Sequence, residues 1–131
     1  MSAPRVTLDP IDAARATGDA TWRVTWRLAN DGPSELRIAT VGAPHSRFRA
    51  PDRDWTLALA PGSAAELALE IRCDAQPGSE IENAFVIVTA DHEGATWRIL
   101  ARLRVREDAA GVPRPVTERI DVQEVGFSGR G

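Results

Sequence analysis

The chain has 131 residues, enough for one domain with a substantial core, and a formal net charge of −3 at pH 7. This charge argues against nucleic-acid binding, and the lone Cys73 excludes an intramolecular disulfide and a cysteine-based zinc site. All 16 basic residues are arginine, which is typical of a GC-rich bacterial coding background. No apolar run is long enough to span a membrane, so we expect a cytoplasmic protein.

One strand in the first part of the chain is expected to organise the core. It follows a short, edge-like strand at 5–8 and an ambiguous helical turn at 11–15. The segment 21–30 then alternates strictly between apolar and polar residues, as a half-buried strand does. Its apolar side carries Trp22, Val24, Trp26 and Leu28. Two tryptophans on one side, each able to bury roughly 150–250 Å², predict the centre of the core.

The next strand is predicted at 35–41, after the turn signal Asn30-Asp31-Gly32-Pro33. The alternation is then lost. We interpret 42–54 as a long connection across the end of the domain, with Phe48 anchored in the core.

Two further alternating segments, 55–59 and 66–73, flank a Pro61-Gly62 turn and predict a hairpin. We expect the second segment to lie beside the tryptophan strand in one sheet. The residues that this pairing brings together on the sheet exterior are Arg23 and Arg27 with Glu66 and Glu70.

The last two core strands are predicted at 82–90 and 96–106, joined by a turn at 91–94. The segment 84–88 is apolar on both faces, as in a strand that is central or whose outer face is covered. Seven turn-punctuated strands without a convincing helix predict an all-β fold. We expect an immunoglobulin-like β-sandwich of about seven strands with a C-terminal arm.

Two short motifs carry a resemblance. A strand with aromatic residues ends in Asn-x-Gly, here Asn30-Asp31-Gly32, and a Pro-Gly turn, here Pro61-Gly62, precedes a further core strand. With these motifs the run from Val6 to Val105 resembles bacterial immunoglobulin-like modules of the hydin and major sperm protein type. The resemblance implies a sandwich that acts as an interaction module, and it implies no site. The Cys…Trp…Cys pattern of antibody domains is absent.

The arginines of the last core strand mark the candidate site, because they share one side of that strand with Leu100. We expect the neighbouring strand to present valines beside them. The candidate interaction face is Val86, Val88, Arg98, Leu100, Arg102 and Arg104. It is either a sheet exterior in which arginine stems cover apolar neighbours or a face for protein binding or self-association.

The sandwich is predicted to occupy 1–106, followed by a linker and C-terminal arm at 107–131. Strand character returns at 116–127, which ends at Phe127 and also carries acidic residues. We expect this arm to cover the candidate face, and we favour a homodimer that exchanges arms over docking on the same chain.

Few residues offer chemistry. We expect His92 and the neighbouring acids to be solvated turn residues, because adjacent side chains on a tight turn diverge and rarely ligate one ion. Ser46 follows His45, but adjacency in sequence does not make a nucleophile and a base. Cys73 is predicted to be an inert, buried thiol. We therefore expect no catalytic residue, no metal and no cofactor.

The sequence thus predicts a non-enzymatic protein-interaction or structural module that self-associates and binds neither nucleic acid nor membrane. The alternative is a small-molecule-binding protein or an enzyme that uses the 42–54 connection, with Pro44-His45-Ser46-Arg47 lining a pocket.

Overall fold

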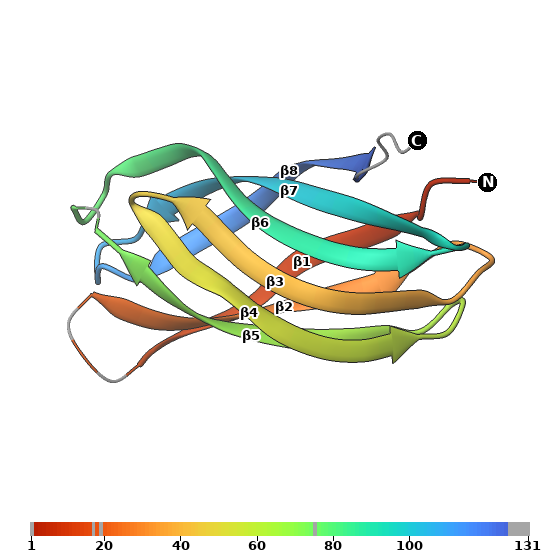
Figure 1. Ribbon diagram of the computed structural model, residues 1–131. Coiled ribbons are helices and arrows are strands. Elements are labelled where there is room, and N and C mark those ends of the chain that lie inside the picture. The colour runs from red at the N-terminus through yellow and green to blue at the C-terminus, as the bar shows by residue number, and fades with distance from the viewer. Residues whose placement is uncertain (1, 17, 19, 75, 126–131) are drawn as a thin grey trace.

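The computed structural model describes residues 2–16, 18, 20–74 and 76–125. These residues form eight strands and no helix, which confirms the all-β class. The strands are β1 (Val6–Arg15), β2 (Thr21–Asn30), β3 (Leu36–His45), β4 (Phe48–Leu59), β5 (Ala64–Cys73), β6 (Glu80–His92), β7 (Ala95–Glu107) and β8 (Pro113–Glu124). They curve around a common interior (Figure 1).

All neighbouring strands are antiparallel, in the order β1-β2-β5-β4-β3-β6-β7-β8. The pairing between β5 and β4 is confined to Phe48 opposite Cys73 and Arg49 opposite Arg72. One group of strands, β1-β2-β5, is therefore joined to the other, β4-β3-β6-β7-β8, by a single short ladder.

The outermost strands, β1 and β8, come together without forming a ladder. The Thr117 hydroxyl donates a hydrogen bond of 2.7 Å to the Leu8 carbonyl across this gap. Prolines 10, 113 and 115 lie on both sides of it, and proline has no N–H to donate. The sheet is therefore nearly closed, but no backbone ladder joins β1 to β8.

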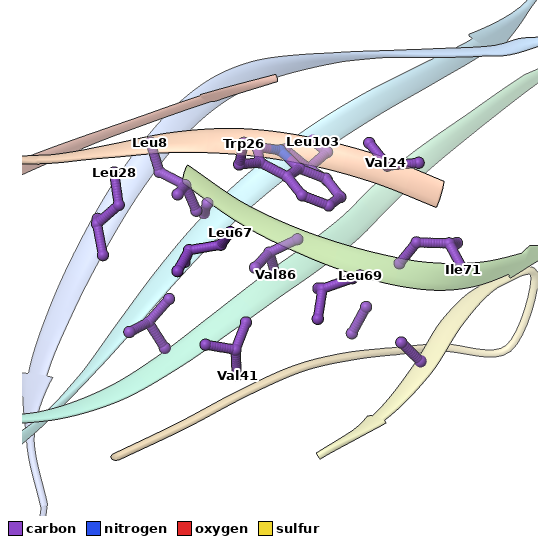
Figure 2. Close-up of a cluster of buried hydrophobic side chains, with 14 of the residues drawn as sticks. Leu8, Val24, Trp26, Leu28, Val41, Leu67, Leu69, Ile71, Val86 and Leu103 are labelled. Carbon is purple, nitrogen blue, oxygen red and sulfur yellow. The ribbon is translucent and has the colours of Figure 1, made fainter. Parts of the chain in front are cut away.

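The core is centred on the tryptophan strand, as predicted. Trp26 is completely buried and meets Phe48 edge to face, with ring centroids 6.3 Å apart. Figure 2 shows Trp26 surrounded by side chains of other strands, among them Leu67 of β5, Val86 of β6 and Leu103 of β7. Both groups of strands thus contribute to one core.

The predicted partnership of β2 and β5 is confirmed. Arg23 lies opposite Glu70 and Arg27 opposite Glu66. The Arg23 guanidinium and the Glu70 carboxylate are 3.7 Å apart, and both side chains are well exposed. Such a pair contributes little to stability, about 0–1 kcal/mol, so β2 and β5 are held together mainly by their buried faces.

The first strand is longer than predicted, and the ambiguous segment 11–15 belongs to it and forms no helical turn. The strand β1 continues to Arg15 because the register shifts between Pro10 and Asp12. This irregularity leaves Ile11 exposed and returns Ala13 to the inner side. Because the extra residue interrupts the alternation of inward and outward side chains, the sequence pattern does not reveal that the strand continues.

The long connection predicted at 42–54 is also wrong, because this stretch forms the hairpin of β3 and β4. His45 lies opposite Phe48, and the register shifts twice along the pair. A Cβ in place of the Gly42 hydrogen would collide with the Asp52 carboxylate and lie 3.0 Å from the Asp52 Cα, so a larger residue here would require Asp52 to move. The shifts break the alternation that reveals a strand. The anchoring of Phe48 in the core is confirmed.

The hairpin predicted from 55–59 and 66–73 does not form at the Pro61-Gly62 turn. Instead β4 pairs with β3, while β5 pairs with β2. The connection is tied to the end of β2, because Asn30 N–H donates to the Ser63 carbonyl and Gly62 N–H donates to the Asn30 carbonyl, both at 2.9 Å. The turn therefore carries the chain from one group of strands to the other.

We expect Trp26→Ala to reduce the free energy of unfolding by about 3–5 kcal/mol, because it empties a fully buried site in contact with Phe48. The matched control is Arg27→Ala, which alters the exposed side of the same strand and should change stability by less than about 0.5 kcal/mol. Urea denaturation followed by fluorescence measures both. Equal losses would contradict the assignment of the two faces.

Candidate functional site

The valines predicted to share the arginine face lie in the core instead. Val86 is opposite Ala101 and Val88 is opposite Ile99 in the β6–β7 ladder, and all four are buried. The expectation that Val86 and Val88 lie beside the arginines is therefore wrong. The arginines occupy the other side of the sheet.

The face that the arginines do occupy is apolar at its centre. Phe85 lies opposite Arg102, Ile87 opposite Leu100 and Thr89 opposite Arg98. We call Phe85, Ile87, Arg98, Leu100 and Arg102 the outer β6–β7 face. Its three apolar side chains are half-buried, which explains why the sequence of β6 is apolar on both sides.

The sequence already contained a signal for this arrangement. The turn at Glu93-Gly94 joins β6 and β7 with His92 opposite Ala95. A two-residue turn fixes the register of a hairpin, and this register pairs position 85 with 102 and position 87 with 100. Counting back from the turn would have selected Phe85 and Ile87 in place of the valines.

Two arginines of the face have no acidic partner among residues 2–16, 18, 20–74 and 76–125. Arg104, just beyond the face, contacts the Glu118 carboxylate at 3.0 Å. Within the described part of the chain, Arg98 and Arg102 form no such ion pair, and the Nε of Arg102 is buried without a hydrogen-bond acceptor. The face thus combines half-buried apolar side chains with two uncompensated positive charges.

The C-terminal arm is strand β8, and it extends the sheet rather than covering the face. It lies beside β7 (Figure 1) and pairs with it from Glu107 opposite Pro113 to Trp97 opposite Glu124. Ile120 and Val122 pack against the core. The expectation that the arm lies over the arginines is therefore wrong, and Phe127 lies outside the described residues.

The predicted linker before the arm contains a tight turn at 108–112, which connects β7 to β8. The Asp108 carboxylate accepts hydrogen bonds from the N–H groups of Ala110 and Val112 at 2.9 and 3.0 Å. It also contacts the Arg114 guanidinium at 3.1 Å. The bond from Val112 N–H, together with Arg114, lowers the pKa of Asp108 below its ordinary value.

The residues that could carry chemistry are separated from one another. His45 Nδ1 accepts a hydrogen bond from Arg47 N–H at 3.0 Å, which makes His45 part of the β3–β4 turn. Ser46 is exposed in the same turn. Of the 42–54 segment that the alternative hypothesis invoked, Arg49, Ala50, Pro51 and Arg53 line a groove.

His92 is not the solvated turn residue that we expected. It is 2% exposed, and its ring nitrogens have no hydrogen-bond partner among the described residues. The reason is that His92 lies opposite Leu36 and so falls on the inner side of β6. Its neighbour Asp91 accepts a hydrogen bond from Thr96, and Glu93 accepts one from Ser34. The side chains of residues 91–93 therefore point in different directions and do not form one site.

Metal and membrane sites were also sought in the structure. Among residues 2–16, 18, 20–74 and 76–125, no three histidine, cysteine or acidic side chains come together as a metal site would require. Within the same ranges, no helix has the length and apolar character of a membrane span.

Cys73 is buried, as predicted, and its thiol donates to the Glu107 carboxylate at 3.2 Å. Burial raises the pKa of this thiol to about 12, and the hydrogen bond and negative charge of Glu107 act in the same direction. A thiolate is the reactive form of cysteine. Cys73 is therefore held in its unreactive form at neutral pH.

This thiol should make the fold sensitive to alkali. The chain has no lysine and no tyrosine, so Cys73 is the side chain whose protonation is expected to differ between the unfolded and folded states from about pH 9 to 11. The unfolded thiol, with its ordinary pKa of 9.0, loses its proton first. Stability is therefore fully present below that pKa and falls as the pH rises toward 12.

We expect the free energy of unfolding to fall by about 2 kcal/mol between about pH 9 and 11, as measured by urea titration at each pH. The control is Cys73→Ala, which should be less stable at neutral pH but should lose no further stability across this window. A wild-type profile as flat as that of the variant would contradict the coupling.

The chain was compared with known proteins. No model of a protein family matches it, and no curated protein matches it in sequence.

Proposed function

We propose that the chain is an immunoglobulin-like module that binds protein and carries out no catalysis. The strand order supports the architecture, since an immunoglobulin sandwich keeps its first, second and fifth strands in one sheet and its third, sixth and seventh strands in the other. Here β1-β2-β5 adjoin one another, and so do β4-β3-β6-β7. The strand β8 is an addition to that plan, at the edge of β7.

The observation that carries the proposal is the position of Arg98 and Arg102, which form no ion pair with any described residue, beside Phe85, Ile87 and Leu100. Aromatic and aliphatic anchors next to arginine are the composition of binding hot spots. The partner that fits is a protein segment with apolar residues flanked by carboxylates. A second copy presenting the same face would instead oppose arginine to arginine.

The test is selection from a displayed peptide library, followed by affinity measurement on the purified chain. We expect the selected peptides to combine apolar with acidic residues. Arg98→Ala and Arg102→Ala should each weaken binding about tenfold, the effect of losing about 1.4 kcal/mol. The matched control Arg106→Ala, whose charge is paired with Glu80 at 3.0 Å, should leave affinity unchanged. Peptides without acids, or binding that survives both substitutions, would contradict the proposal.

We also propose self-association through the arm. Exchange of β8 between two chains would reproduce the same β7–β8 ladder between protomers, with the short connection at 108–112 as the hinge.

Light scattering during size-exclusion chromatography of the full chain is expected to give a dimer mass. Inserting four glycine and serine residues after Ala109, where they relax the hinge, should shift the mass toward the monomer. A full-length chain that is monomeric at all concentrations would rule out arm exchange.

A further inference from the structure

A second binding site is suggested by the place where β4 and β5 separate. Beyond the short ladder at Phe48 and Arg49, the two strands diverge, although both continue for most of their length. From Ala64 to Ile71, β5 pairs with β2 on one edge, and no described strand pairs with its other edge. An unpaired edge offers a row of backbone N–H and C=O groups to an extended chain.

A groove of about 390 Å³ lies at this separation. It is lined by Thr21, Arg49, Ala50, Pro51, Arg53, Leu69, Glu70 and Arg72. Three arginines thus face one acid, and the carboxylate of that acid, Glu70, is already engaged by Arg23 at 3.7 Å. The groove is therefore open and electropositive.

The arginines of the groove lie close enough together to repel one another. Arg49 lies directly opposite Arg72 in the two-pair ladder that joins the two groups of strands. Like charges directly opposite each other destabilise a sheet. Arg72 is partly neutralised by Asp74 at 3.4 Å, while Arg49 has no acidic partner among the described residues and Arg53 lies over the Trp55 ring at 5.4 Å. Negative charge supplied by a ligand would relieve this repulsion.

The two edges of the groove differ in what they can accept. Pro51 removes a donor from β4, and the register of β4 shifts next to it. By contrast, the edge of β5 from Ala64 to Ile71 contains no proline, and its register with β2 is regular. An added strand would therefore pair with β5 and present side chains to the arginines of β4.

We propose that the β4–β5 groove binds an extended acidic peptide, which adds as a strand to the free edge of β5 and places carboxylates against Arg49, Arg53 and Arg72. This site is separate from the outer β6–β7 face and does not depend on it. Backbone pairing supplies the affinity, and the arginines select acidic side chains.

The probe is an end-capped nonapeptide of alternating glutamate and valine, titrated into the full ¹⁵N-labelled chain at low salt. We expect chemical-shift changes centred on residues 49–53 and 66–72. Arg49→Ala and Arg53→Ala should each weaken binding at least fivefold without lowering the melting temperature, since both side chains are exposed. Arg106→Ala is the matched control and should bind as wild type does.

Three further arms make the outcome decisive. Two versions of the peptide carry backbone N-methyl groups, one at the glutamates and the other at the valines. Their affinities should differ, because only one version has its methyl groups on the N–H groups that pair with β5. Inorganic phosphate alone should not reproduce the shifts. Equal binding of both methylated peptides, or full competition by phosphate, would reduce the site to a simple anion site and overturn strand addition. Loss of binding in Arg98→Ala or Arg102→Ala alone would move the peptide to the outer β6–β7 face and overturn the assignment, as would no binding at all.

Discussion

The contact between Trp26 and Phe48 is the interaction on which the rest of the structure depends. Trp26 comes from β2 and Phe48 from β4, so the rings join the two groups of strands where only a two-pair ladder connects them. An edge-to-face pair adds about 0.5–1.5 kcal/mol beyond the area that it buries. Phe48 also lies opposite Cys73, whose thiol is held neutral. The junction thus relies mainly on packing, with Arg49 and Arg72 on its outer side and the buried Glu107 carboxylate bonded to the Cys73 thiol.

The sequence predicted the parts of the fold that follow a strict period of two. The faces of β2, the pairing of β2 with β5, and the buried side of β7 from Trp97 to Val105 all emerged from alternation. The sequence did not predict the parts in which the register between two strands shifts. The shifts after Pro10 and around Gly42 invert the pattern within a strand. Periodicity then predicts a turn or a loop in segments whose backbone remains extended.

The candidate site was predicted in part, for a related reason. The arginines of β7 and Leu100 were placed on the correct side because one strand alone determines it. The valines were misplaced because that question depends on register between strands, and β6 is apolar on both sides. The pairing of β4 with β3, and the addition of β8 at the edge, depend on which distant segments meet, and local patterns carry no such information.

The two places where the sheet fails to close illustrate different ways of managing a free edge. Between β1 and β8, prolines remove backbone donors and Thr117 bridges the gap, so a further strand finds few partners there. Between β4 and β5, the β5 edge keeps its donors and the surrounding arginines repel one another. Positive charge discourages a second copy from pairing at this edge, since its own arginines would approach. The same charge would favour the acidic strand proposed above, so one feature both disfavours pairing between copies and selects the proposed partner.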